Sequence, residues 1–260
     1  MPRGVSPVDE ARLQGRLWTP TASDMGNGLL LHSDVGVQLT ASNKATQWTS
    51  LFGGWTFTQS NDALRPVLTR WPLDQVALLN SGLGAASTRL TGTTLFTPFE
   101  AASNFSIFVV FNATGTGWLL SKGSATPSER VGVVVIGPDL YMVLNGGAVT
   151  TPVPLNTNCL ATIIFSAGAV TMRLNGQPVR TGTLPIVTGA NANNRLVIGP
   201  STDPNVMPGL LRDVMVLPYS ASLPLIEKVE GYLAHRWGGL PLSRLIADHP
   251  FRNRPPLIGD

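Results

Sequence analysis

The sequence predicts an all-β fold in which two antiparallel sheets pack face to face as a jelly-roll sandwich, closed by one C-terminal amphipathic helix. Three observations lead to this prediction. The 260 residues include 27 Gly and 21 Pro, which divide the chain into short segments, as a many-stranded fold requires. Segments rich in β-branched and aromatic residues recur between these breaks. A clear helical spacing of apolar residues occurs only near the C-terminus. All-β sandwiches of this length form single domains, so we expect one main domain.

The chain divides into three predicted parts. Residues 1–17 lack periodicity and are expected to form an extended arm, residues 18–222 the β-sandwich, and residues 223–260 a helix with a basic, proline-containing tail packed on the sandwich. Short strands are expected at 28–31, 36–39, 47–48 and 55–57, and clearer strands at 105–111, 118–121, 131–136, 140–144, 160–165, 170–174, 195–198 and 211–217.

Two Asn-Gly pairs predict β-hairpins. Asn145-Gly146 and Asn175-Gly176 each separate two extended runs, and both pairs suit the positive φ angles of a type I′ turn. In the strand before the second pair, side chains alternate, so we expect Val170 and Met172 to face the core and Arg173 to face solvent.

The predicted helix begins near Leu223. Its apolar stripe consists of Ile226, Val229, Leu233 and Trp237, and its solvent side is expected to carry Glu227, Lys228, Glu230 and Arg236. Ser222 is placed to cap the first turn, Pro224 falls within that turn, and Gly238 with Gly239 favours an exit in the left-handed conformation.

Charge is sparse and concentrated at the two ends. Only 13% of residues are charged, the formal net charge is +3, and the only lysines are Lys44, Lys122 and Lys228. Arginine suits planar ion pairing at protein interfaces, so we expect docking onto an acidic protein neighbour. The candidate docking residues are Arg3, Arg12, Arg16, Arg244, Arg252 and Arg254. Direct nucleic-acid binding is not expected, because the chain has neither a dense basic patch interleaved with aromatics nor a recognisable nucleic-acid module.

The cysteine content and the N-terminus bear on the compartment. Cys159 is the sole cysteine, so no intrachain disulfide can form. The first 16 residues lack the apolar run of a signal peptide, and the apolar runs elsewhere are too short to span a bilayer. We expect a protein made and folded in a cytoplasm, without a membrane partner.

Catalytic patterns are weak, so the sequence favours a protein that is not an enzyme. A glycosidase on a sandwich needs two facing carboxylates, and no closely spaced carboxylate run is present. Pairing of Glu100 or Glu129 from distant strands stays open. No histidine stands in a metal-ligand spacing, and a serine triad using His32 and Asp34 lacks a nucleophile elbow.

The sequence contains residues whose chemistry suits a ligand, but no motif that defines a ligand site. Asp62 and Asp203 lie in oxygen-rich loops that suit Ca²⁺, although both are explained more simply as turn residues; no other cofactor is expected. Trp55, Trp71 and Trp118 are candidates for stacking against a sugar, and each also fits a core position.

The C-terminal segment carries a family resemblance. Residues Gly209 to Trp237, followed by Ala247-Asp248-His249-Pro250-Phe251 and by Pro255-Pro256, resemble the concanavalin A-like or laminin-G-like sandwich domains of tailed-bacteriophage structural proteins and some bacterial surface proteins. The resemblance covers about residues 18 to 256. It implies the same sandwich and a non-enzymatic role in a virion, as a capsid decoration protein or a tail accessory protein. Synthesis would then take place in the host bacterial cytoplasm.

The implied partners are other virion proteins, of the capsid or tail, and further copies of the chain. The alternative is a carbohydrate-binding adhesin that contacts a glycan on the host surface, because this fold hosts both kinds of protein.

Overall fold

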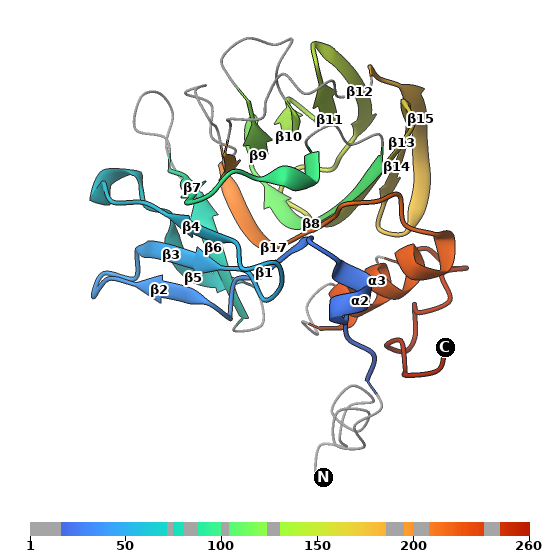
Figure 1. Cartoon of the computed structure of the whole chain (residues 1–260), viewed down its shortest axis with the longest axis horizontal. Helices are drawn as coiled ribbons and strands as arrows, with labels where there is room; N and C mark the ends of the chain where they lie inside the picture. The colour runs from blue at the N-terminus through green and yellow to red at the C-terminus, as the bar shows by residue number, and fades with distance from the viewer. Residues whose placement is uncertain are drawn as a thin grey trace.

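The computed structural model describes residues 17–71, 75–80, 88–99, 104–123, 131–185, 195–199, 208–236 and 245–260, and this part of the chain forms two antiparallel sheets packed face to face (Figure 1). The predicted sandwich is confirmed. Of the predicted arm, only Leu17 is among the described residues, and it forms an isolated bridge with Leu257. None of the helices in the described part is long and apolar enough to cross a membrane.

The first sheet has the strand order β15-β14-β13-β8-β17-β6-β5, and β1 also pairs with β17. Its strands are β1 (Leu29–His32), β5 (Val67–Trp71), β6 (Gln75–Asn80), β8 (Asn104–Ala113), β13 (Asn158–Ser166), β14 (Ala169–Leu174), β15 (Gln177–Thr183) and β17 (Gly209–Leu217).

The second sheet has the order β12-β11-β10-β9-β16-β7-β4-β3-β2. Its strands are β2 (Val37–Leu39), β3 (Ala45–Thr49), β4 (Thr56–Thr58), β7 (Leu90–Gly92), β9 (Gly117–Lys122), β10 (Val131–Ile136), β11 (Asp139–Leu144), β12 (Gly147–Pro152) and β16 (Leu196–Ile198). The helical segments described are α2 (Ala22–Met25), η1 (Asp62–Leu64), η2 (Thr97–Phe99) and α3 (Leu223–His235).

Strand β8 is apolar on both faces, and the structure explains why. Phe105, Val109 and Phe111 lie in the main core with side chains of the second sheet, such as Trp48. Phe108 and Val110 point the other way, into a second core beneath α3. A continuous apolar run is typical of a strand buried on both faces, as the sequence of β8 shows.

Both predicted Asn-Gly hairpins are present. Asn145 and Gly146 have φ angles of 47° and 83° between β11 and β12, and Asn175 and Gly176 have 51° and 85° between β14 and β15. These pairs of positive φ angles are those of type I′ turns, whose twist matches that of the flanking strands.

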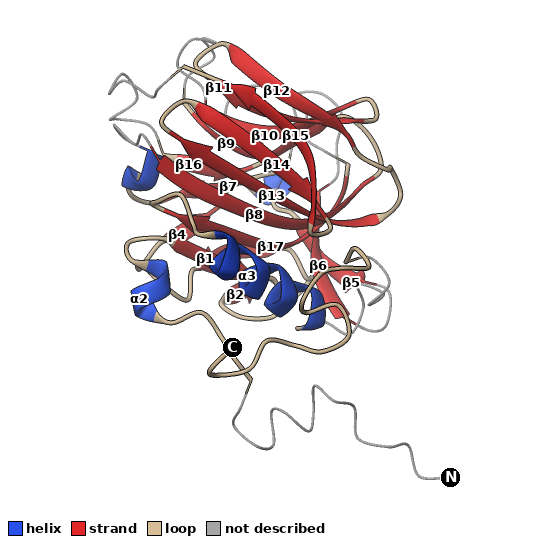
Figure 2. Cartoon of the chain, turned by 90° about the vertical axis from the view of Figure 1, so that its right-hand side faces the viewer, coloured by secondary structure: helices blue, strands red, loops and turns tan. Residues whose placement is uncertain are grey.

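Helix α3 lies on the outer face of the first sheet, as Figure 2 shows. Ile226, Val229 and Leu233 are buried, which confirms the apolar stripe, whereas the last predicted member, Trp237, lies outside the described residues. Pro224 stands in the first turn as predicted, but the side chain of Ser222 makes no capping hydrogen bond.

Two predictions of solvent exposure were wrong, and they share one cause. Glu230 is fully buried and Arg173 is 7% exposed. The two side chains meet because α3 packs on β13, next to β14, so that Glu230 reaches Arg173 on the side of β14 that was predicted to face solvent.

The C-terminal tail returns along α3 and closes the second core. Phe251 is buried over Gly231, where an added Cβ atom would lie only 2.5 Å from the Phe251 Cβ, so the close approach of tail and helix requires glycine. The His235 Nε2 atom lies 2.6 Å from the Phe251 carbonyl oxygen. The described N-terminal end joins this layer, since the Trp18 backbone N–H donates to the Pro256 carbonyl at 3.0 Å.

Candidate functional site

An open hollow of about 480 Å³ lies over β3, β4 and β7 of the second sheet. Every side chain that lines it is polar, and the set offers hydroxyl, amide and guanidinium groups. The lining residues are Thr46, Thr58, Gln59, Ser60, Arg65, Arg89 and Thr91.

Strand register places two threonines in the hollow. Thr58 of β4 is directly paired with Thr91 of β7. Their chain neighbours Phe57 and Leu90 are buried in the main core. Because successive side chains of a strand point to opposite faces, Thr58 and Thr91 project away from the core and stay partly exposed.

The segment after β4 forms one wall through its own side-chain hydrogen bonds. Asn61 caps η1, accepting at Oδ1 from the Ala63 backbone N–H at 3.0 Å. Gln59 Oε1 accepts from the Asn61 N–H at 3.0 Å, and Gln59 Nε2 donates to the Arg89 carbonyl at 3.3 Å. Asn side chains favour such local caps, so this sequence folds the wall into a defined turn.

Arg65 is held in place by this wall. Its Nε donates to the Gln59 carbonyl at 2.8 Å, its Nη2 to the Ser60 carbonyl at 2.8 Å, and its Nη1 to Asp62 Oδ1 at 3.0 Å. A guanidinium group has five N–H donors in a rigid plane. These three bonds fix its orientation and leave donors over for a ligand.

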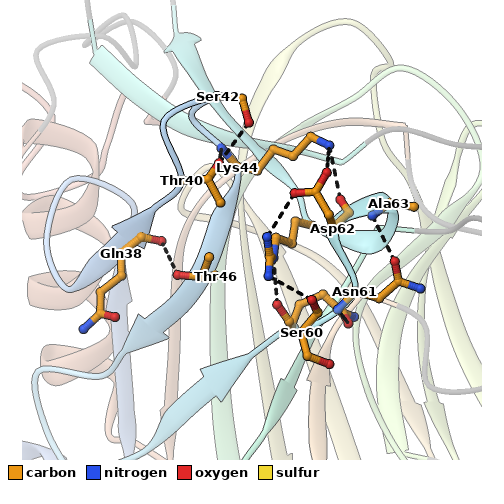
Figure 3. A network of polar contacts seen from close by, with 11 residues as sticks. Gln38, Thr40, Ser42, Lys44, Thr46, Ser60, Asn61, Asp62 and Ala63 are labelled. Carbon is orange, nitrogen blue, oxygen red and sulfur yellow. Dashed lines mark hydrogen bonds and ion pairs between the residues drawn. The ribbon is translucent and has the colours of Figure 1, made fainter.

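Asp62, predicted as a possible Ca²⁺ ligand, lies at the edge of the hollow in an ion-pair network (Figure 3). One carboxylate oxygen accepts from Lys44 and the other from Arg65. The hydrogen bond from Lys44, together with the charges of Lys44 and Arg65, lowers the pKa of Asp62 below its ordinary value. Among the described residues no group of three or more His, Cys, Asp or Glu could hold a metal ion, and Asp203 lies outside them.

The three tryptophans predicted for sugar stacking have different positions. The half-buried Trp55 donates from Nε1 to the Gly28 carbonyl at 3.1 Å and packs on Phe96 with ring centroids 4.9 Å apart. Trp118 is buried, with 6% of its surface exposed. Trp71 belongs to β5, but its side chain lies outside the described part. Neither Trp55 nor Trp118 lines the hollow.

The basic residues predicted for docking are described only in the tail. Arg254 is exposed, forms an ion pair with Asp260 at 2.7 Å and stands over the Phe251 ring. Its hydrogen bond to Asp260 lowers the pKa of that carboxyl to about 2. Arg252 is half-buried, and Arg3, Arg12, Arg16 and Arg244 lie outside the described residues.

Among the described residues, His32 and Asp34, which were weighed for a serine triad, have different partners. His32 is fully buried and pairs with Asp213, not with Asp34, and its Nε2 lies 3.1 Å from the Tyr232 hydroxyl. Asp34 instead accepts from Arg236 at 2.7 Å. Glu100 and Glu129 lie outside the described part of the chain.

The hollow itself was not predicted from the sequence. Threonine and glutamine are common in short strands and turns, so these residues did not stand out in the sequence. The seven lining residues come from three strands and two loops. The register of β4 with β7 is what brings Thr58 and Thr91 together, and no local pattern contains that information.

Comparison with known proteins identifies the fold through solved structures. No family model matches the chain, and no curated protein matches it in sequence. Solved structures do match. Trypanosoma rangeli sialidase in complex with sialic acid has a TM-score of 0.56 and 16% identity over 84% of this chain and 34% of the sialidase.

Two binding domains are about as similar to this chain as the sialidase is. The binding domain of Paraclostridial Mosquitocidal Protein 1 has a TM-score of 0.57 and 11% identity over 79% of this chain and 52% of that one. The binding domain of botulinum neurotoxin DC in complex with rat synaptotagmin II has a TM-score of 0.54 and 13% identity over 77% and 52%.

The chain has a concanavalin A-like fold. It spans about a third of the sialidase and about half of each binding domain. At these identities the similarity shows the fold alone.

Proposed function

We propose that the chain is a non-enzymatic recognition module that binds a glycan on a host surface through the polar hollow over β3, β4 and β7. The observation that carries the proposal is the lining of that hollow. Sugars present many hydroxyl groups, and a concave surface with several oriented hydroxyl, amide and guanidinium groups offers hydrogen-bond donors and acceptors to them. Thr58, Thr91 and Gln59 supply such groups on a rigid sheet and a capped turn.

The structural neighbours support a binding role more than any particular ligand. Two of them are named as binding domains. Because one fold carries many functions, the ligand has to be inferred from this chain's own side chains.

A glycan array probed with the intact chain and with two hydroxyl-deleting variants tests the proposal. Thr58→Val and Thr91→Val keep the strand-forming shape and remove one hydrogen-bonding group each. A hydrogen bond contributes about 0.5–1.5 kcal/mol, so each variant should weaken binding about 2- to 10-fold. Thr150→Val, on β12 of the same sheet and outside the hollow, is the matched control. A flat array, or equal loss in the control, would contradict the proposal.

Trp55→Ala tests whether the glycan binds in the hollow or instead stacks on Trp55. If the hollow binds the glycan, this variant should bind as the parent does, provided that thermal unfolding shows it to be folded. Loss of binding in Trp55→Ala with no loss in Thr58→Val would move the site to the tryptophan.

A second candidate function is that of a structural protein of a tailed-phage virion, as a capsid decoration or tail accessory protein made in the bacterial cytoplasm. The resemblance carried by Gly209 to Trp237 and by the tail favours it, and in the described residues α3 and the tail do form one packed layer. The two candidates are compatible, since a recognition module can be mounted on a particle through its ends and through copies of itself.

Mass spectrometry of purified virions tests the second candidate, because absence of the chain from particles would refute it. Deleting residues 1–16, or changing Arg252 and Arg254 to Ala, should lower occupancy on the particle while the sandwich stays folded. Since Arg254 already pairs with Asp260, that variant also breaks an internal contact. Circular dichroism should accompany the occupancy measurement.

A further inference from the structure

Two buried histidines hold the C-terminal tail, residues 245–260, on α3. His235 at the end of α3 is 4% exposed and donates from Nε2 to the Phe251 carbonyl at 2.6 Å. His249 of the tail is 5% exposed, and its Nε2 donates to Glu230 Oε2 at 3.2 Å. The Nδ1 atom of His249 accepts from the Phe251 backbone N–H, also at 3.2 Å. One imidazole from the helix and one from the tail thus bind the two sides of the Phe251 backbone.

These partners assign the protons of the His249 ring. An atom that accepts from a backbone N–H carries no proton, so Nδ1 is bare and Nε2 carries the single proton of a neutral ring. A second proton can enter only at Nδ1, where it would face the Phe251 N–H as a second donor. Protonation of His249 therefore breaks its contact with Phe251.

Counter-charge for protonated histidines is already used up. Both oxygens of Glu230 accept two hydrogen bonds, and its charge is paired with that of Arg173. The other charged side chains described on α3, β13, the β14–β15 hairpin and the tail are partly or fully exposed: Arg180, Glu227, Lys228, Arg236, Asp248, Arg252, Arg254 and Asp260. Each proton added to His235 or His249 thus adds a buried positive charge, which is costly without a partner.

The surroundings of His235 oppose its protonation. Burial and the neighbouring His249 lower the pKa of His235 below its ordinary value of 6.5, although the hydrogen bond to the Phe251 carbonyl acts in the other direction. A group with a depressed folded pKa stabilises the fold above its unfolded pKa, and this contribution is lost as pH falls through the folded value. Glu230 is still ionised in that range, because its folded pKa lies below 4.5.

We propose that residues 245–260 form a strap that mild acid releases from α3 while the two sheets stay folded. The strap also holds the other described end of the chain, since the Trp18 backbone N–H donates to the Pro256 carbonyl. Its release therefore frees both ends together. The proposal does not depend on the glycan-binding hollow, which lies on the second sheet, whereas the strap and α3 lie on the first.

Hydrogen–deuterium exchange of the intact chain at pH 7.5 and pH 5.5, read by mass spectrometry, tests the strap. Labelling times are scaled to the intrinsic exchange rate at each pH. The peptide covering 245–256 should exchange about 10-fold faster at pH 5.5 after this correction, because linked equilibria typically change by about 5- to 150-fold. Peptides from β8 and β13 should keep their protection at both pH values.

Variants tie the response to the two imidazoles. His235→Gln keeps a donor near the position of Nε2, and His249→Asn keeps an acceptor near the position of Nδ1, but neither residue titrates. The ratio of tail exchange at the two pH values should fall in each variant and approach 1 in the double variant. Asp248→Asn, which removes an exposed carboxyl group of the tail, is the control and should keep the ratio of the parent.

A titration of the parent gives a check that needs no variant. The chain has only three histidines, so their ring signals in a ¹H–¹³C spectrum can be followed with pH. The midpoint of tail opening should coincide with the titration of His235 or His249. Equal tail protection at both pH values, opening while both rings stay neutral, an unchanged ratio in the double variant, or loss of protection in β8 together with the tail would each overturn the proposal.

Discussion

Two ionic networks in this molecule use the same chemical groups in opposite surroundings. Under α3, Glu230 is fully buried and meets Arg173 and His249. At the edge of the hollow, Asp62 meets Lys44 and Arg65 with 58% of its side chain exposed. An exposed ion pair contributes little to stability, whereas removing one partner of a buried pair is costly. The first network therefore holds the fold, and the second is free to serve recognition.

The buried network joins four segments of the chain. Glu230 Oε1 accepts from the Thr162 hydroxyl at 2.8 Å and from Arg173 Nε at 2.9 Å. Its Oε2 accepts from Arg173 Nη2 at 3.0 Å and lies 3.2 Å from His249 Nε2. One carboxylate thus connects α3 with β13, β14 and the tail.

The largest expected effect is the loss of this carboxylate. Glu230→Gln keeps the shape of the side chain but leaves the Arg173 charge buried without its counter-charge. Removing one partner of a buried ion pair costs about 3–5 kcal/mol, and urea unfolding should show a decrease in that range. Glu227→Gln, at a partly exposed position of the same helix, should change the unfolding free energy by about 0.5 kcal/mol or less. Equal effects of the two variants would show that the network does not anchor the helix.

The same carboxylate should make stability depend on pH. Burial raises the pKa of Glu230, but the hydrogen bonds from His249, Arg173 and Thr162 and the Arg173 charge outweigh it, so the folded pKa lies below the ordinary value of 4.5. A carboxyl group with a depressed folded pKa stabilises the fold above its unfolded pKa, and this contribution is lost as pH falls through the folded value. The unfolding free energies of the parent and Glu230→Gln should therefore converge below pH 4.5. A constant difference down to strong acid would contradict the assignment.

A smaller effect is expected at Thr162, which supplies one hydrogen bond to Glu230. Thr162→Val removes that bond and leaves Arg173 and His249 in place. The expected destabilisation is about 1–3 kcal/mol, the cost of leaving a buried acceptor short of a donor. In the double variant with Glu230→Gln, the two effects should not add, because both residues belong to one network. Additive effects would place Thr162 outside the network.

The contrast between the networks also explains what could be predicted from the sequence. Strand β8, the two Asn-Gly hairpins and the apolar stripe of α3 follow from local patterns, and the structure has all of them. Glu230 and Arg173 were both predicted to face solvent, because the helical spacing of α3 and the alternation of side chains in β14 were each interpreted without regard to the other element. They stand 57 positions apart along the chain, and only the packing of α3 on the first sheet brings them together. The hollow was missed for the same reason, since it depends on strand register.

The smallest expected effect on stability is at the exposed network. Asp62→Asn removes the carboxylate charge that Lys44 and Arg65 share, but water replaces the lost contacts at this exposed position. We expect no measurable shift of the urea midpoint, whereas Glu230→Gln should shift it clearly. Binding should respond differently, because Asp62 accepts from Arg65 Nη1 and so helps to orient a guanidinium that lines the hollow: a glycan bound there should bind Asp62→Asn more weakly than the parent. Affinities measured for both proteins check this, and Asp248→Asn, which removes the same charge at an exposed position of the tail, is the control. Equal binding by Asp62→Asn and the parent would show that the orientation of Arg65 does not depend on Asp62.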